Sequence, residues 1–277
     1  MPGPLAIATV PYLNARPLVY GLAEREDVRL VEALPAALGG MLRRGEADAA
    51  LAPSVAYFRL AAEGGERTRS ARPGRFVALP VAAIGSRGPV ASVRLVGYTP
   101  PKAVRRVRLD PASRTSNALA RVILAETMGL EPHCVLPEDE APDDRPPDAE
   151  VLMGDRALVT HPPGAAWAMD LGEAWDDLTH LPFVYAFWMA RSDADAGRLT
   201  AVLSAARDAG LAAREAIAAA GAEELGLPPA DVRRYLYDQV RYAFGAAERK
   251  GLTAFYRMAV AERLVPEGAR LRLAEAG

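Results

Sequence analysis

Short apolar segments alternate with amphipathic segments along the first two thirds of the chain. The apolar segments are rich in Ala, Val, Leu and Ile, which is typical of buried strands. They predict strands at residues 5–10, 28–32, 48–52, 76–84, 92–97, 104–109, 133–136, 149–153 and 181–190. Helices are predicted between them, from about residue 15 and at residues 35–44, 55–63 and 117–128. Strands that alternate with helices indicate right-handed crossovers and a largely parallel sheet.

The pattern becomes purely helical after Arg191. The spacing of apolar side chains predicts helices at residues 196–220, 229–240 and 246–264. Two earlier stretches carry loop signals instead. Residues 66–75 are polar and rich in Arg, and residues 137–148 hold four prolines among acidic residues.

Composition and charge exclude several classes of protein. The 277 residues suit two domains, and 51% hydrophobic with 25% charged residues predicts a folded core. A net charge of −2 argues against nucleic acid as the partner. The single cysteine excludes an intrachain disulfide and a CxxC motif, and neither a metal-ligand set nor a nucleotide-binding motif is visible. We therefore expect neither metal nor cofactor.

Membrane and export signals are also missing from the sequence. No apolar stretch approaches the roughly 20 residues that a membrane span needs. The first residues lack the basic region of a signal peptide. We expect a soluble, cytoplasmic protein with no membrane partner, as a monomer or a homodimer.

Ligand-binding loops follow from the predicted sheet. Ligands of such sheets bind beyond the carboxyl ends of the strands, where helix N-termini point. This rule selects the loops at residues 11–14, 53–54, 111–117 and 154–155. To these we add the glycine-containing turn at residues 85–89.

The loop with the sequence SRTSN carries the strongest signal. Arg114, Thr115, Ser116 and Asn117 place a guanidinium, two hydroxyls and an amide where a strand meets a helix. Unpaired N–H groups of the first helical turn favour an anion, and Arg114 can neutralise a carboxylate. An ordinary N-cap formed by Ser113 or Ser116 explains the same residues equally well.

Four further side chains lie in the selected loops. Tyr12 and Asn14 offer a phenol and an amide, while Ser54 and Asp155 stand at predicted helix starts. The chain has only two Asn but 31 Arg and 2 Lys, a bias that suggests high genomic G+C content and disfavours Asn codons. An Asn retained against that bias favours a functional role for Asn14. N-capping is the alternative for Asn14, Ser54 and Asp155.

Ser86 lies between Gly85 and Gly88 in a tight turn, which can hold its hydroxyl rigidly. The turn resembles a nucleophile elbow, but residue 84 is Ile where that motif has Gly, and a strand follows instead of a helix. None of the three histidines has a clear triad context. A serine hydrolase is therefore rejected.

Several motifs in the same order resemble chorismate dehydratase of the futalosine route to menaquinone. They are VPYLNARPL (10–18), GEADAALAPSVAYFR (45–59), GSRGPVASVRL (85–95), LDPASRTSNALARVIL (109–124) and LPFVYAFWMA (181–190). The resemblance implies a type II periplasmic-binding-protein-like α/β fold with mixed, mostly parallel sheets. Its two lobes, residues 1–88 plus 189–277 and residues 89–188, would flank a ligand cleft, and the helical tail would pack onto the first lobe.

The resemblance also implies a reaction, the loss of water from chorismate to give 3-[(1-carboxyvinyl)oxy]benzoate. Asn14 and Ser86 would face the reacting ring as catalytic residues. The loop from Arg114 to Asn117 would hold a carboxylate, with Tyr12, Ser54 and Asp155 as further substrate-binding residues. No His, Glu or Lys lies in these loops, and Asp155 is the nearest carboxylate. We therefore expect a carboxylate of the substrate to remove the ring proton.

Three other interpretations share the predicted fold. A non-catalytic binding protein for small carboxylates would need an export signal, which we do not see. The sister enzyme of the same route, 1,4-dihydroxy-6-naphthoate synthase, carries a histidine in its first ligand loop, where this chain has PYLN. A ligand-sensing domain of a regulator would carry a DNA-binding extension.

Overall fold

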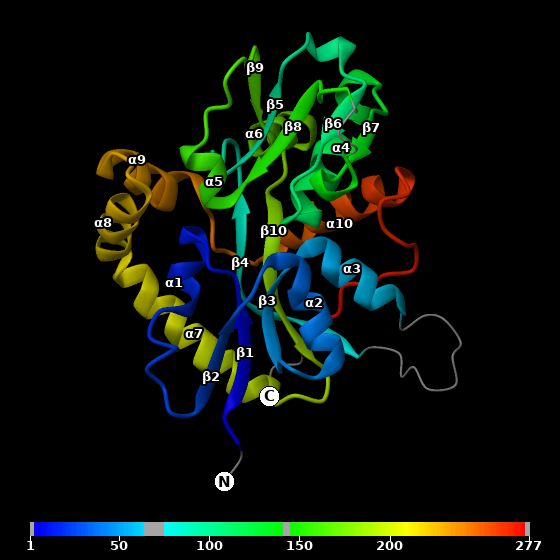
Figure 1. Cartoon of the computed structure of the whole chain (residues 1–277). Helices are drawn as coiled ribbons and strands as arrows, with labels where there is room; N and C mark the ends of the chain where they lie inside the picture. The colour runs from blue at the N-terminus through cyan, green and yellow to red at the C-terminus, as the bar shows by residue number, and fades with distance from the viewer. Residues whose placement is uncertain (1–2, 64–74, 141–144, 275–277) are drawn as a thin grey trace.

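Two five-stranded sheets, each covered by helices, form the molecule in a computed structural model (Figure 1). The structure describes residues 3–63, 75–140 and 145–274. Of the polar loop expected at residues 66–75, only Arg75 lies within the described residues. The expected alternation of strands and helices is confirmed, and the α/β class with it.

The first sheet, in the lower half of Figure 1, has the strand order β2-β1-β3-β10-β4. Strand β1 pairs in parallel with β2 on one side and with β3 on the other. Strand β10 is antiparallel to both of its neighbours, β3 and β4. Its strands are β1 (Leu5–Thr9), β2 (Val28–Glu32), β3 (Ala49–Pro53), β4 (Phe76–Ser86) and β10 (Phe183–Arg191). Its first helices are α1 (Arg16–Val19), α2 (Pro35–Arg44) and α3 (Ser54–Glu63).

The second sheet, in the upper half of Figure 1, has the strand order β7-β6-β8-β5-β9. Here β5 is the strand that runs antiparallel to both neighbours. Its strands are β5 (Val93–Gly97), β6 (Arg106–Arg108), β7 (His133–Val135), β8 (Ala149–Met153) and β9 (Trp167–Asp170). Its helices are α4 (Arg114–Met128), α5 (Gly154–Val159) and α6 (Leu171–Thr179).

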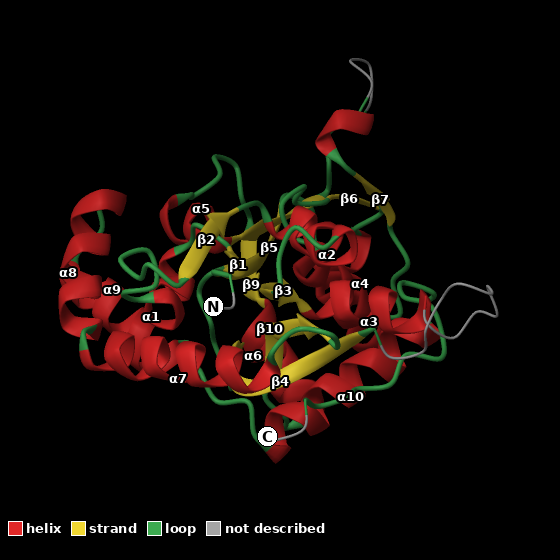
Figure 2. Ribbon diagram, turned by 90° about the horizontal axis from the view of Figure 1, so that it is seen from below, coloured by secondary structure: helices red, strands yellow, loops and turns green. Residues whose placement is uncertain are grey.

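The helical tail packs on the first sheet and on helix α4 of the second lobe. Its helices are α7 (Ala196–Ala212), α8 (Arg214–Leu225), α9 (Pro229–Arg234) and α10 (Ala246–Ala261), with a π-helical turn at Tyr235–Gln239. Helix α7 lies along α1 and β4 (Figure 2), and α10 contacts both β10 and α4. The tail therefore packs onto the first sheet, as expected, and through α10 it also reaches α4 of the second lobe.

An aromatic cluster joins the two sheets and the tail. Trp175 of α6 meets Phe183 of β10 edge-on, with ring centroids 5.2 Å apart, and Phe255 of α10 packs on both at 6.0 and 4.8 Å. Each of the three side chains is at most 1% exposed. Burying rings of this size contributes strongly to stability, so the cluster fixes the two sheets and the tail relative to one another.

Three sequence predictions need correction. Helix α4 begins at Arg114 and not at Asn117, because Ser113 caps it. The helix expected at residues 196–220 is two helices that meet at Ala213. Helix α6 and strand β9 were not predicted, and α5 was predicted only through a helix start at Asp155. The prediction of mixed, mostly parallel sheets is confirmed. In each sheet four strands run in one direction and a single strand, β10 or β5, runs in the other.

The division of the chain into lobes follows the sheets. We propose a first lobe built on residues 1–88 and the chain's final part, and a second lobe after residue 88, as the sequence predicts. The pairing of Phe183 with Ser86 favours a second boundary just before Phe183 instead of at residue 189, because all of β10 belongs to the first sheet.

Candidate active site

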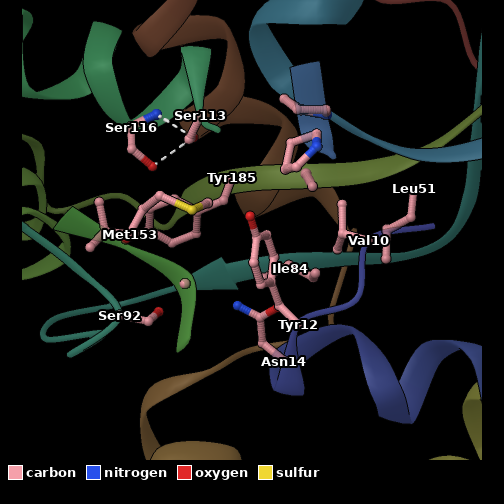
Figure 3. Close-up of a pocket in the computed structure, with 15 residues that line it drawn as sticks. Val10, Tyr12, Asn14, Leu51, Ile84, Ser92, Ser113, Ser116, Met153 and Tyr185 are labelled. Atoms are coloured by element: carbon pink, nitrogen blue, oxygen red, sulfur yellow. Dashed lines mark hydrogen bonds between the residues drawn. The ribbon is translucent and has the colours of Figure 1, made fainter. Parts of the chain in front are cut away.

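A cavity lies between the two sheets and is lined by both of them. Segments from both sheets, including β10 of the first, contribute side chains to its wall (Figure 3). The lining residues are Val10, Tyr12, Asn14, Pro35, Leu51, Pro53, Ile84, Ser92, Val93, Ser113, Ser116, Met153, Gly154, Tyr185 and Ala186.

The wall of this cavity carries no ionisable acid or base other than phenols. Among the described residues that line it there is no carboxylate, imidazole, amine or guanidinium. Its polar groups are phenols, hydroxyls and an amide, set among apolar side chains. Such groups orient a ligand by hydrogen bonding, but they do not supply a carboxylate or imidazole base at neutral pH.

Two phenols of the wall are hydrogen-bond donors. Burial raises the pKa of Tyr12 to about 12, and the negative charges of Asp110 and Asp155 add to the rise. Burial likewise raises the pKa of Tyr185 well above its usual range. Both phenols therefore keep their protons at neutral pH, so they donate hydrogen bonds and do not act as bases.

Asn14 lies in the short turn Leu13–Ala15 that follows β1, and its side chain is buried at 9% exposure. Its amide nitrogen Nδ2 donates a hydrogen bond to Tyr235 Oη at 3.0 Å. Its oxygen Oδ1 is buried and has no hydrogen-bond partner among the described residues. Asn14 is one of the lining residues, and its amide keeps an acceptor that no described residue uses.

Ser86 stands one layer behind the cavity wall. Its Oγ lies 3.0 Å from Tyr185 Oη, and Tyr185 is the lining residue. Gly172, near the start of α6, packs closely on both hydroxyls, since a Cβ there would lie 2.7 Å from Ser86 Oγ. The structure therefore places Ser86 in contact with Tyr185, a side chain of the wall.

The N-terminus of α4 reaches the cavity through two serines. Ser113 Oγ accepts a hydrogen bond from the backbone N–H of Ser116 at 3.1 Å and donates to Ser116 Oγ at 2.9 Å (Figure 3). Ser113 is therefore the N-cap, as one of the two interpretations of this loop predicted. Because both serines also line the cavity, the capped first turn of a 15-residue helix faces the ligand space.

Thr115 and Asn117 use their polar atoms within the protein. Thr115 Oγ1 accepts a hydrogen bond from the backbone N–H of Val55 at 3.2 Å, which links the starts of α3 and α4. Asn117 bonds the backbone of Asp110 through both ends of its amide, at 2.8 and 3.0 Å. Both residues lie outside the set that lines the cavity and hold the surrounding loops in place.

Arg114 and Ser54 also lie outside the cavity wall. Ser54 Oγ donates to the backbone carbonyl of Val184 at 2.6 Å and ties α3 to β10. Arg114 is exposed and lies beside Arg59 of α3. Burial and the charge of Arg114 lower the pKa of Arg59. Two cations therefore stand close together on the outer side of the cleft.

Asp155 connects the two lobes. Both of its carboxylate oxygens accept the backbone N–H of Leu13, at 3.1 Å, although Asp155 belongs to α5 and Leu13 to the turn after β1. The neighbouring Gly154 has a φ of +63°, and a Cβ there would lie 3.2 Å from the Tyr12 ring. Burial raises the pKa of Asp155. The carboxylate holds the backbone between Tyr12 and Asn14 instead of facing the cavity.

Several residues of the site were not predicted from the sequence, and four of them matter for its chemistry. Ser92, Met153 and Tyr185 line the cavity, and Tyr235 bonds Asn14 from behind. Met153 is the last residue of β8, directly before the selected residues 154–155. The rule that ligands bind beyond strand ends could therefore have included it. Tyr185 and Tyr235 fall inside apolar patterns that indicate core positions.

The two lobes with a cavity between them define a protein of the periplasmic-binding-protein fold. The structure resembles a protein from Archaeoglobus fulgidus solved by structural genomics, with a TM-score of 0.69, 17% identity, and coverage of 94% of this chain and 98% of that one. It also resembles the periplasmic aliphatic sulphonate binding protein SsuA of Escherichia coli, with a TM-score of 0.61, 18% identity, and coverage of 97% and 96%.

The chain belongs to the menaquinone biosynthesis family, whose model matches residues 5–261. It is 30% identical over 269 residues to the curated chorismate dehydratase of Thermus thermophilus. That alignment covers 91% of this chain and 94% of the relative. The resemblance drawn from the sequence motifs is therefore confirmed at the level of the family.

Membrane-spanning helices and clustered metal ligands are both missing from the described residues. No helix in the described part of the chain is both long and apolar enough to span a bilayer. Within the same residues, no group of three or more His, Cys, Asp or Glu side chains is placed to hold a metal ion.

Proposed function

We propose that the protein is a chorismate dehydratase, a hydro-lyase that converts chorismate to 3-[(1-carboxyvinyl)oxy]benzoate and water. The observation that carries the proposal is the 30% identity to a chorismate dehydratase over nearly the whole of both chains. The cavity between the lobes supports it, because its wall of phenols, hydroxyls and one amide suits a reaction that asks for orientation more than for a strong protein base. We further propose that the enzyme acts in the futalosine route to menaquinone and is cytoplasmic.

The chemistry of the substrate explains why such a cavity is sufficient. Loss of a ring proton and of the neighbouring hydroxyl makes the ring aromatic, which supplies a large driving force. A carboxylate of the bound chorismate removes the proton, and the protein fixes the geometry of that transfer. Protonated phenols donate hydrogen bonds that stabilise the departing oxygen.

The residues at the wall then take distinct roles. Tyr12 and Tyr185 are the donors that face the ring, and Ser86 acts through Tyr185 by holding its hydroxyl. Asn14 faces the same space through its free Oδ1. The capped start of α4, at Ser113 and Ser116, receives one carboxylate of the substrate at its backbone N–H groups.

The arginine pair outside the cavity suits the approach of a dianion. Arg59 and Arg114 line a groove between α2, α3 and α4 that shares Pro35 and Pro53 with the cavity wall. Positive charge beside a cleft raises the local concentration of an anionic substrate, and salt weakens the effect. We propose that Arg114 acts here, before the substrate is enclosed, and that Thr115, Asn117 and Ser54 support the loops.

Incubation of the purified protein with chorismate tests the proposed function. We expect the aromatic product to appear, with a mass lower than that of chorismate by one water, measured by ultraviolet absorbance and mass spectrometry. Binding of chorismate without conversion would instead identify a non-catalytic carboxylate-binding protein. Conversion of a cyclic futalosine derivative and not of chorismate would identify the sister synthase.

Asp155 offers a test of how the ring proton is removed. Because Asp155 binds the backbone of Leu13, Asp155→Ala removes a hydrogen bond between the lobes, and we expect kcat/KM to fall about tenfold. Asp155→Asn keeps an acceptor for that N–H, so its kcat/KM stays within a few-fold of the unaltered enzyme. Steady-state kinetics measures both. Abolition of turnover in both variants, with chorismate binding intact, would make Asp155 the general base and contradict substrate assistance.

A further inference from the structure

A buried tyrosine of the helical tail contacts the candidate catalytic amide. Tyr235 is 2% exposed, and its Oη accepts the hydrogen bond from Asn14 Nδ2 at 3.0 Å across 221 residues of sequence. Asn14 lines the cavity, whereas Tyr235 is not among the lining residues and lies behind it.

The local backbone explains how a tail residue reaches this place. Residues Tyr235–Gln239 form a π-helical turn at the end of α9, and α9 begins only six residues earlier, at Pro229. A π-turn widens a helix by one residue and re-aims its side chains, and such turns are frequent at functional sites. Here the turn directs a phenol into the space between the two lobes.

The hydrogen bond between Asn14 and Tyr235 has one direction. The amide Nδ2 can only donate, so the Tyr235 oxygen accepts from it and does not use its own proton for this contact. Burial raises the pKa of Tyr235, which keeps that proton in place at neutral pH. With Nδ2 engaged, the remaining group of the amide is Oδ1, which is buried and unpartnered in the described residues.

We propose that Tyr235 is a positioning residue that fixes the amide of Asn14 with its oxygen toward the substrate. Asn14 then accepts a hydrogen bond from the substrate hydroxyl and orients it, and the donors to that oxygen are the phenols of the wall. This inference rests on the proposed function, because it states that the substrate hydroxyl donates and Asn14 accepts in their hydrogen bond.

The test compares Tyr235→Phe with Tyr242→Phe in the chorismate assay. Tyr242 is a matched control, since it is also buried, at 8% exposure, and its Oη has no partner among the described residues. We expect Tyr235→Phe to lower kcat about tenfold with KM nearly unchanged, because the amide of Asn14 loses its anchor. We expect Tyr242→Phe to leave kcat and KM unchanged, because the hydroxyl it removes has no hydrogen-bond partner among the described residues.

A double-mutant cycle separates positioning from a general structural effect. In an Asn14→Ala background the amide is absent, so Tyr235→Phe should lower kcat by less than about twofold further. Equal tenfold losses in both backgrounds would show that Tyr235 does not act through Asn14, and unchanged kcat in Tyr235→Phe would also overturn the inference. If Tyr235→Phe does not fold, Tyr235→Met is compared in both backgrounds instead, and equal losses of kcat in the two backgrounds contradict the inference.

The unaltered protein distinguishes the two proposals. If it does not convert chorismate, the proposed function fails and the positioning role falls with it. If it converts chorismate and Tyr235→Phe does so equally well, the function stands and only the positioning role is wrong.

Discussion

Replacing Asn14 by Ala is expected to lower the kcat for chorismate by about 10²–10³-fold, the loss typical of a preorganised hydrogen bond to a reacting oxygen. Asn14 is 9% exposed, its Oδ1 is free, and its Nδ2 is held by Tyr235. The acceptor is therefore oriented before the substrate arrives, and Ala removes it without adding a new group. Product formation under saturating chorismate measures the change.

Thr9→Val is the matched control for this prediction. Thr9 ends the same strand that leads to Asn14, it is fully buried, and its Oγ1 has no partner among the described residues. Val has nearly the same shape, so turnover should stay within about twofold. A normal kcat in Asn14→Ala would remove this residue from the mechanism, and the assignment of the reacting hydroxyl would then have to change.

Gly210→Ala is expected to produce a large loss of stability. Gly210 lies in α7 where the helix crosses α1, and a Cβ there would stand 2.0 Å from the backbone oxygen of Pro17. The obstacle is backbone and cannot rotate away, so one helix must shift. We expect the free energy of unfolding to fall by about 3 kcal/mol, the upper part of the range for overpacking. Denaturant unfolding measures it.

A second glycine of the same helix provides the comparison. Gly197 is exposed near the start of α7, and its nearest atom to an added Cβ is a side-chain oxygen of Asp195 at 3.6 Å. Gly197→Ala should leave stability unchanged or raise it by up to about 1 kcal/mol, because Ala favours the helix. Equal stability of the two variants would contradict the close packing of α7 on α1.

Local sequence patterns were sufficient for most of the fold. Residues 28–32 and 35–44 match β2 and α2 residue for residue, because the apolar pattern is strong and Gly45 ends the helix in the left-handed region at φ +75°. Strand β9 was missed because it is short and only half-buried. Helix α6 had a signal, since Asp170 caps its first turn and Glu173 stands three residues on.

The candidate site was predictable only in part. Asn14 and Tyr12 follow from the rule that ligands bind beyond strand ends. Tyr185 does not, because its place at the cavity depends on the insertion of β10 between β3 and β4, which no local pattern contains. Tyr235 shows helical apolar spacing that indicates a core residue, and its contact with Asn14 spans 221 positions. Long-range pairings of this kind are set by the tertiary fold.

The double contact of α10 with β10 and α4 has a consequence for motion. In Figure 1, α5, which carries Asp155, lies to the left of β4, whereas α10 lies to the right of β10. Because α10 packs on β10 of the first sheet and on α4 of the second lobe, parting the lobes on its side would unpack the rings of Trp175, Phe183 and Phe255. On the side of α5, the lobes are joined by the hydrogen bond from the Leu13 N–H to Asp155, so we expect substrate to enter there.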